Sequence, residues 1–157
     1  MATVYMMIGI PGSGKSTYVG EKLERAFTRI ISPDEIRKEL YGDISIQGDG
    51  EKVFKIVDER LRYCAIHEIN VIYDATNTTK HRPKTVLKLR EMGFDKVIGV
   101  YMNTPFGVCV ERNKQRKDRS KPVPDDVMLK MFVNMKNTEY ELFSDGFDEI
   151  RIINRLK

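Results

Sequence analysis

The chain has 157 residues, enough for one domain with its own hydrophobic core, so neither a disulfide framework nor a structural metal is needed to hold it together. Its composition, 41% apolar and 32% charged, is typical of a soluble globular protein. No run approaches the roughly 18 apolar residues of a membrane span, and no basic region with a long apolar core opens the chain, which excludes a membrane-spanning segment and indicates a cytoplasmic protein.

The formal net charge is only +4, from 27 basic and 23 acidic residues. It is unevenly spread, because six of the ten residues 112–121 are Lys or Arg, and we expect an anion site there. The two cysteines, Cys64 and Cys109, fit a reducing compartment and are expected to pack as small apolar side chains.

The first expected strand covers residues 4–8 and leads into Gly9–Ser16, which matches the phosphate-binding template G-x-x-x-x-G-K-[ST] at every specified position. A helix is predicted to follow over residues 15–25. The unpaired N–H groups of a helix start and the positive end of its dipole attract a triphosphate. Lys15 is expected to reach the β and γ phosphates, and the Ser16 hydroxyl to hold Mg²⁺.

A second short strand over residues 28–31 leads into a helix start, with Ser32 as N-cap and Pro33 at the first helical position. Asp34 and Arg37 share one face of this helix, beside the sheet edge where the P-loop lies. From position alone, Asp34 is either an acid favoured by the helix dipole or a general base for an attacking hydroxyl. Arg37 is either a solvated helix residue or a clamp on an anionic substrate.

Residues 42–50 are polar and glycine-rich and predict a mobile loop. The helix after it is expected to bury one apolar stripe made of Phe54, Val57, Leu61, Cys64 and Ala65. A third strand, residues 70–74, ends on Asp74. This carboxylate has two interpretations: it supports Mg²⁺ or the phosphate site, or it is a buried hydrogen-bonding group that ties the following turn.

Pro83 and Gly93 frame another helix, and residues 96–102 predict a fourth strand. The next helix begins at residues 104–105 and is expected to carry one stripe of arginines, namely Arg112, Arg116 and Arg119. An apolar stripe marks the last helix, formed by Val127, Met128, Met131, Phe132 and Met135. Residues 150–153 predict a strand that closes the sheet.

Strands thus alternate with helices, which predicts an α/β fold: a three-layer P-loop NTPase or kinase-like fold with a mostly parallel sheet of about five strands. We expect residues 1–157 to form a single domain, with an arginine-rich helical lid over about 112–122 that closes over the phosphates. An arginine in such a lid is worth about 10³ to 10⁵ in rate in other P-loop enzymes. The other interpretation of this segment is a basic, solvated helix face.

Four groups of residues, in this order, resemble the P-loop polynucleotide 5′-hydroxyl kinases, a family that includes phage enzymes and the kinase domains of bacterial RNA-repair proteins. They are Gly9–Thr17, Asp34-x-x-Arg37, Asp74-Ala75-Thr76-Asn77, and Arg112-Asn113-Lys114-Gln115-Arg116 followed by Val123-Pro124 and the methionine-rich helix. The P-loop is generic, but the ordered set is much more specific. The resemblance covers most of the chain and implies a stand-alone kinase, since the phosphatase and ligase modules of some members are absent.

The resemblance also implies a role for individual residues. Asp34 would act as general base on the 5′-hydroxyl, and Arg37 would contact the phosphate next to the acceptor nucleoside. Arg116 would clamp the donor phosphates. The segment from Arg116 to Pro124 is longer than in some members, so Arg119 competes with Arg116 for that role.

We therefore predict an ATP-dependent polynucleotide 5′-hydroxyl kinase that acts on DNA or RNA ends, with Mg²⁺ as cofactor and ATP or another NTP as phosphate donor. The predicted catalytic residues are Lys15, Asp34 and Arg116. The predicted nucleotide-binding residues are Gly9, Pro11, Gly12, Ser13, Gly14, Lys15, Ser16, Thr17, Arg112, Arg116 and Arg119. The predicted metal ligands are Ser16 and Asp74. Two alternatives stay open: a P-loop kinase for a small-molecule or nucleoside hydroxyl, and a nucleotide-binding module without catalysis.

Overall fold

The computed structural model describes residues 1–20 and 28–155. The described residues form one sheet, with the strands β1 (Thr3–Ile8), β2 (Thr28–Ile31), β3 (Asn70–Tyr73), β4 (Lys96–Asn103) and β5 (Glu149–Asn154). The helices are α1 (Lys15–Tyr18), α2 (Pro33–Tyr41), α3 (Gly50–Ile66), α4 (Arg82–Met92), α5 (Phe106–Gln115), α6 (Asp125–Asn137) and the 3-10 helix η2 (Glu139–Ser144). In this part of the chain, no helix combines the length and the apolar character that crossing a membrane would require.

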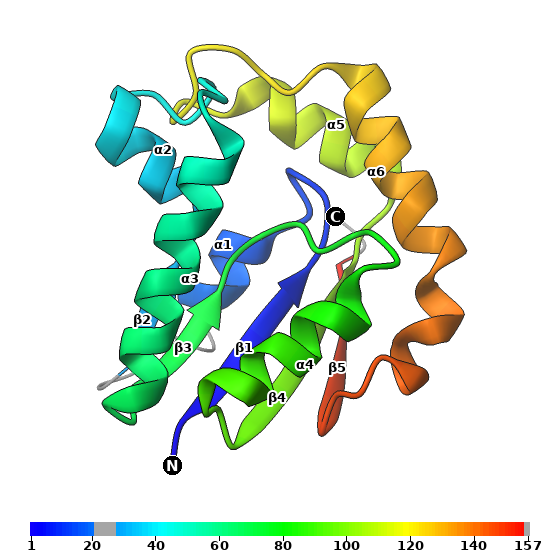
Figure 1. Cartoon of the computed structure of the whole chain (residues 1–157). Coiled ribbons are helices and arrows are strands. Elements are labelled where there is room, and N and C mark those ends of the chain that lie inside the picture. Colours follow the sequence, from blue (N-terminus) through cyan, green and yellow to red (C-terminus); the bar gives the residue numbers. More distant parts are fainter. Residues whose placement is uncertain (21–27, 156–157) are drawn as a thin grey trace.

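The sheet has the strand order β2-β3-β1-β4-β5, and every neighbouring pair is parallel. In the register of the central strand, Val4 of β1 pairs with Val71 of β3 on one side and with Val97 of β4 on the other. The carboxyl ends of all strands therefore meet at one edge, where the P-loop, the start of α2 and the connection from α5 to α6 come together (Figure 1). The predicted fold class, an α/β P-loop kinase-like fold, is confirmed.

The two faces of the sheet are covered by different helices, as the alternation of side chains along a strand requires. Val4 and Met6 of β1 pack in a cluster with the buried sides of α3 and α4. Met7 points the other way and packs with Tyr18 and Val19, at the end of α1. These side chains are buried on both faces, and each fully buried side chain of this size contributes about 1.5 to 3 kcal/mol.

A third cluster joins α5, α6 and η2 to the ends of β1 and β4, and it is formed by Ile8, Ile10, Tyr101, Cys109, Val123, Met128, Met135 and Leu142. It holds the two helices beside the P-loop. Cys109 lies inside this cluster and Cys64 inside the cluster under α3, so the prediction that both cysteines are small buried apolar residues is confirmed.

The start of α2 is built as the sequence predicts. The Ser32 hydroxyl caps the helix by accepting from the backbone N–H of Glu35 at 3.4 Å, and Pro33 occupies the first helical position. Gly42, with a φ of 78°, ends the helix in the left-handed conformation. This short, capped helix presents its first turn to the carboxyl edge of the sheet.

The helix predicted over residues 15–25 begins at Lys15, as expected, and α1 extends to Tyr18. The part of this prediction over residues 21–25 lies outside the described residues.

The prediction that Phe54 belongs to the buried stripe of α3 is wrong. Its side chain is 44% exposed, and Val53 takes the buried position with 0% exposure. The other four residues of the predicted stripe, Val57, Leu61, Cys64 and Ala65, are buried as expected, so only its first position is misassigned. Phe54 instead lines the large cavity at the carboxyl edge.

The prediction that one helix carries all three arginines is also wrong. The helix α5 ends at Gln115, and Arg116 has an extended backbone (φ −66°, ψ 133°). The buried side chain of Asn113 bonds both backbone polar groups of Val123, donating to its carbonyl at 2.8 Å and accepting from its N–H at 3.2 Å. This pair folds residues 116–124 back as a loop, which helical spacing alone does not reveal.

Candidate active site

The P-loop is held in shape by its own glycines and lysine. Gly12 and Gly14 have φ values of 79° and 94°, a backbone conformation that favours glycine. The Lys15 ammonium folds back along the loop and donates to the carbonyl oxygens of Gly9 at 2.8 Å and Ile10 at 3.0 Å. The loop is therefore preorganised by short-range contacts.

The neighbouring elements also brace the P-loop. Thr104, after β4, donates to the carbonyl of Ser13 at 2.7 Å. Ser13 is 1% exposed and Gly9 lies at the base of the loop, so neither lines the cavity. A Cβ added at Gly12 would lie 2.3 Å from the carbonyl oxygen of Cys109, so only glycine fits between the loop and α5.

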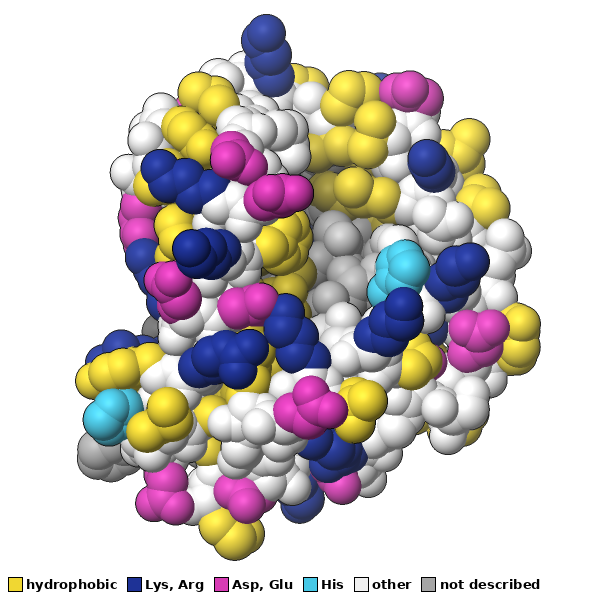
Figure 2. Space-filling model, viewed as in Figure 1, with side chains coloured by type: hydrophobic (Ala, Val, Ile, Leu, Met, Phe, Trp, Pro, Cys, Tyr) yellow, Lys and Arg dark blue, Asp and Glu magenta, His cyan; other side chains and the backbone are white. Residues whose placement is uncertain are grey.

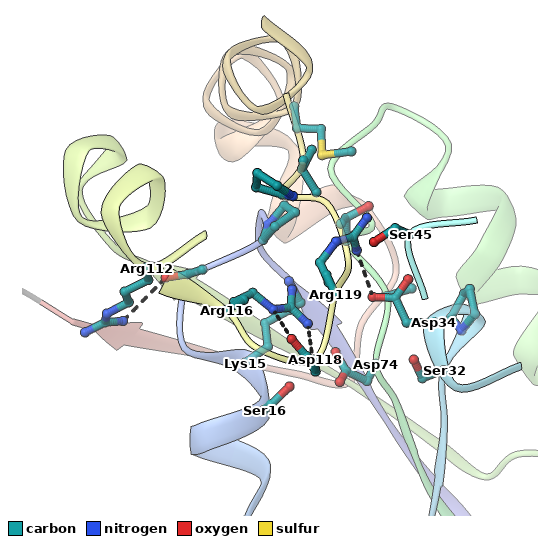
Figure 3. Close-up of a pocket in the computed structure, with 18 of the residues that line it drawn as sticks. Lys15, Ser16, Ser32, Asp34, Ser45, Asp74, Arg112, Arg116, Asp118 and Arg119 are labelled. Atoms are coloured by element: carbon teal, nitrogen blue, oxygen red, sulfur yellow. Dashed lines mark hydrogen bonds and ion pairs between the residues drawn. The ribbon is translucent and has the colours of Figure 1, made fainter. Parts of the chain in front are cut away.

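Lys15 and Asp74 carry opposite charges and are partly buried. Asp74 directly follows β3, and it lines the same cavity as Lys15 and Ser16 (Figure 3). Burial lowers the pKa of the Lys15 ammonium and raises the pKa of the Asp74 carboxyl, because desolvation disfavours each charged form. The opposite charge of each group works against that effect on the other. A polar ligand in the cavity would therefore supply some of the solvation that Lys15 and Asp74 lose through burial.

On the other side of the cavity, Asp34 stands at the start of α2 between two arginines. Its Oδ1 is 3.2 Å from Nη1 of Arg37, one turn along the helix. Its Oδ2 is 3.8 Å from Nη1 of Arg119, which comes from the loop over the site (Figure 3). Both arginines are largely buried, with side chains 13% and 8% exposed, while that of Asp34 is 39% exposed. The carboxylate is thus oriented by two cations yet accessible.

Arg112 and Arg116 face the P-loop. Arg116 makes a bidentate ion pair with Asp118, at 2.9 and 2.7 Å, and its charge acts electrostatically on Lys15 and Asp74. Arg112, the last arginine of α5, reaches the carbonyl oxygen of Gly12 at 3.5 Å. The three arginines therefore divide between the two sides: Arg112 and Arg116 lie toward the P-loop, and Arg119 lies toward Asp34.

A latch joins the arginine loop, residues 116–124, to the turn after α2. The Ser45 hydroxyl donates to the carbonyl of Lys121 at 3.1 Å and accepts from its N–H at 3.2 Å. Hydrogen bonds from Ser120 and from Ser45 lower the pKa of the Asp43 carboxyl to about 2. Sequence reasoning missed this latch, since a serine in a glycine-rich turn carries no signal of a partner 76 residues away.

The P-loop side and the Asp34 side of the site share one cavity of about 840 Å³, within the usual range for ligand sites. Of the predicted site residues, those on its wall are Pro11, Gly12, Gly14, Lys15, Ser16, Thr17, Asp34, Arg37, Asp74, Arg112, Arg116 and Arg119. Seven basic and three acidic side chains line it, an excess of four that equals the formal net charge of the whole chain. The positive charge of this protein is concentrated where an anion would bind.

The cavity also has an apolar wall, and helical spacing assigns three of its residues, Phe54, Val127 and Met131, to the core. The wall is formed by Phe54, Pro122, Val123, Pro124, Val127 and Met131. Figure 2 shows a hollow near the centre of this face of the molecule, with hydrophobic side chains on its rim. The site thus combines a cationic region with a surface suited to a flat apolar group.

Comparison with known proteins places the chain among P-loop proteins. A family model described as an AAA domain matches residues 4–138. A chain of the Pnkp1/Rnl/Hen1 RNA repair complex is similar in structure, with a TM-score of 0.78 and 21% identity over 90% of this chain and 46% of that one. The AvrRxo1-ORF1:-ORF2 complex with ATP matches with a TM-score of 0.75 and 15% identity, over 98% of this chain and 55% of that chain.

A third similar structure comes from the PezAT chromosomal toxin-antitoxin system of Streptococcus pneumoniae, with a TM-score of 0.71 and 18% identity over 99% of this chain and 69% of that one. The present chain spans about half the length of the first two structures. At these identities the similarity shows the fold, which is the P-loop kinase-like α/β fold and implies binding of ATP or another NTP.

Proposed function

The chain belongs to the AAA domain family of P-loop proteins, and from that premise we propose that it is a polynucleotide 5′-hydroxyl kinase. It transfers the γ-phosphate of ATP, or of another NTP, to the 5′-hydroxyl end of DNA or RNA. The observation that carries the proposal is the single cavity in which the P-loop, with Lys15, faces Asp34 and its two arginines. Phosphoryl transfer needs such a donor site and an acceptor base on opposite sides of the moving group.

On the donor side, the P-loop and Lys15 hold the β and γ phosphates, and Arg116 stabilises the charge that develops on the migrating phosphoryl group. To do so, Arg116 exchanges its partner Asp118 for phosphate oxygens. On binding, the Lys15 ammonium exchanges the carbonyl oxygens of Gly9 and Ile10, to which it donates in this structure, for phosphate oxygens.

On the acceptor side, Asp34 takes the proton from the attacking hydroxyl as general base. Arg37 orients this carboxylate through its ion pair and contacts the phosphate that follows the acceptor nucleoside. That contact favours a nucleic-acid end over a bare alcohol. The apolar wall of the cavity supports the same acceptor, since it offers a surface for a nucleobase.

The residues present fit a magnesium ion. The Ser16 hydroxyl and the Asp74 carboxylate line the cavity together and are hard oxygen donors of the kind that Mg²⁺ takes. Among residues 1–20 and 28–155 there is no group of three His, Cys, Asp or Glu that could form a complete metal cage. Phosphates and water would supply the remaining ligands, as is usual for Mg²⁺ at nucleotide sites. Bound there, the ion would neutralise phosphate charge.

The test is transfer of radiolabelled γ-phosphate from ATP with Mg²⁺ to a short 5′-OH oligonucleotide. Wild-type protein should label the end, and Asp34→Ala should lower the rate by about 10² to 10⁴ while ATP binding persists. Glu35→Gln is the matched control, because Glu35 is the exposed neighbouring acid on the same turn and should keep full activity. An unchanged labelling rate in Asp34→Ala would show that Asp34 is not the general base.

A second candidate is a P-loop kinase for a small-molecule or nucleoside hydroxyl. The AvrRxo1 structure with ATP and the PezAT toxin-antitoxin structure match this chain with TM-scores close to that of the RNA repair complex, so the fold by itself does not select a nucleic-acid acceptor. Labelling of nucleosides or sugars, with none of an oligonucleotide, would select this second candidate. If ATP binds and no acceptor is labelled even in a single turnover, the chain is a nucleotide-binding module.

A further inference from the structure

A second cavity, of about 360 Å³, adjoins the first one between α3 and α4. Its floor is apolar and formed by Leu61, Tyr73, Leu89 and Met92, and its rim is polar and formed by Asn77, Thr79, His81, Thr85, Asp58 and Lys88. Its volume lies in the range of sites for small ligands, about 300 to 1,000 Å³. The proposed reaction uses none of these side chains.

Phe54 connects the two cavities, because its side chain lines both. At 44% exposure it is an aromatic ring displayed on the inner side of α3, one position away from the buried stripe. An extended ligand that leaves the acceptor side of the first cavity past Phe54 would enter the second cavity directly. The ring is therefore placed at the passage between them.

The α4 side of the second cavity carries positive charge. Lys88 forms an ion pair with Asp58 across the cavity, which uses one of its three N–H donors and leaves two for another anion. Lys84 lies one turn before Lys88 on the same helix and is exposed, as are Lys80 and His81. Figure 2 shows a histidine and several Lys or Arg side chains beside the hollow. A phosphate fits this rim, and an aromatic base fits the floor.

We propose that the second cavity binds the next nucleotide of a single-stranded acceptor, the one on the 3′ side of the nucleotide that is phosphorylated. Its base stacks on Phe54, and its phosphate lies toward His81 and Lys88. A paired base in a duplex is not available for such a stack, so the site favours single strands. This inference rests on the proposed function, because it assumes an acceptor that is a nucleic acid.

The experiment compares kcat/KM for three 5′-OH acceptors of one series: uridine 3′-monophosphate, the uridine dinucleotide and the uridine pentanucleotide. One base stacked on an aromatic ring is worth about 5-fold to 100-fold in affinity, so we expect kcat/KM to rise at least about 5-fold from one nucleotide to two. Phe54→Ala should remove most of this rise. Tyr63→Ala is the matched control, since Tyr63 is an equally exposed ring on α3 that lines neither cavity.

His81→Ala should reduce the rise in part, while His67→Ala, at the other end of α3 and outside both cavities, should leave it intact. A wild-type protein that phosphorylates all three acceptors with equal kcat/KM would overturn the second site and leave the kinase proposal standing. A rise that persists in Phe54→Ala, or that appears equally at a blunt duplex end, would also overturn it. If no nucleotide acceptor is phosphorylated, the proposed function fails, and the second site fails with it.

Discussion

The P-loop and the arginine loop, residues 116–124, both direct positive charge at the same cavity, and they are held by different kinds of contact. The P-loop is fixed by backbone conformation and by bonds to its own carbonyls, from Lys15 and from Thr104. The arginine loop is fixed by side chains, through the pairs of Arg116 with Asp118 and of Arg119 with Asp34 and through the Ser45 latch.

The arginine loop is the half of the site whose ion pairs change when a nucleotide binds. In the P-loop, the Lys15 ammonium donates to backbone carbonyls, so no carboxylate loses its partner when a phosphate becomes the acceptor, and the glycine backbone keeps its shape. In the arginine loop, each arginine that would bind phosphate is already paired with a carboxylate of the same cavity. The carboxylates of these pairs have side chains 58% and 39% exposed, so water solvates each of them when its arginine turns to a phosphate.

The largest effect is expected from the loop arginines. Arg116→Ala should lower kcat by about 10³ or more, because Arg116 lies on the side of the P-loop and stabilises the moving phosphoryl group. Arg119→Ala should cost less, since this arginine orients Asp34. Steady-state kinetics on the same acceptor will rank them, with Lys117→Ala as control, an exposed loop residue off the cavity wall. A greater loss in Arg119→Ala would assign the clamp to the other arginine.

The rigidity of the P-loop predicts a stability effect. Gly12→Ala forces a Cβ to within 2.3 Å of the Cys109 carbonyl at a φ of 79°, so the free energy of unfolding should fall by about 2 kcal/mol or more. Thermal unfolding should show a Tm lower by about 4 to 10 °C. Gly107→Ala in α5 is the control: nothing lies within 4 Å of the added Cβ, and Tm should hold or rise. An unchanged Tm in Gly12→Ala would show that the P-loop shifts to accommodate the added Cβ without loss of stability.

The latch predicts a small kinetic effect with a small loss of stability. Ser45→Ala removes two exposed hydrogen bonds to Lys121, which water replaces in part, so their loss should cost about 1 kcal/mol in total. The loop should then sit less firmly over the acceptor, and the KM for an oligonucleotide should rise about 5-fold while Tm falls by about 2 to 4 °C. Ser144→Ala, in η2 and far from the cavity, should change neither. An unchanged KM in Ser45→Ala would show that the latch does not support the acceptor side.

The smallest effect concerns pH. Burial lowers the pKa of Lys15 below the ordinary 10.5, so its charge is present at neutral pH and is lost at a lower pH than for an exposed lysine. The alkaline limb of kcat/KM for ATP, which reports the free enzyme, should therefore lie below pH 10.5. Lys15→Arg should move that limb upward, because arginine keeps its charge. A wild-type limb at or above 10.5 would contradict the buried ammonium.

Local patterns in the sequence determined much of this protein. The P-loop template, the Ser32-Pro33 helix start and the alternation of strands and helices were sufficient for the fold class and for most boundaries, because each depends on neighbouring residues. They also predicted that Asp34 and Asp74 lie at one edge of the sheet, since both follow parallel strands. The sequence was therefore sufficient to predict that these two acids lie together.

Only the tertiary structure decided how the two sides of the cavity are divided. Helical spacing placed Arg116 and Arg119 on one stripe, but the bonds of Asn113 to Val123 end the helix and send the two arginines to opposite sides. At the start of α3, Val53 takes the core position and Phe54 lies on the cavity wall. Such contacts join segments far apart in the chain, and no local pattern encodes them.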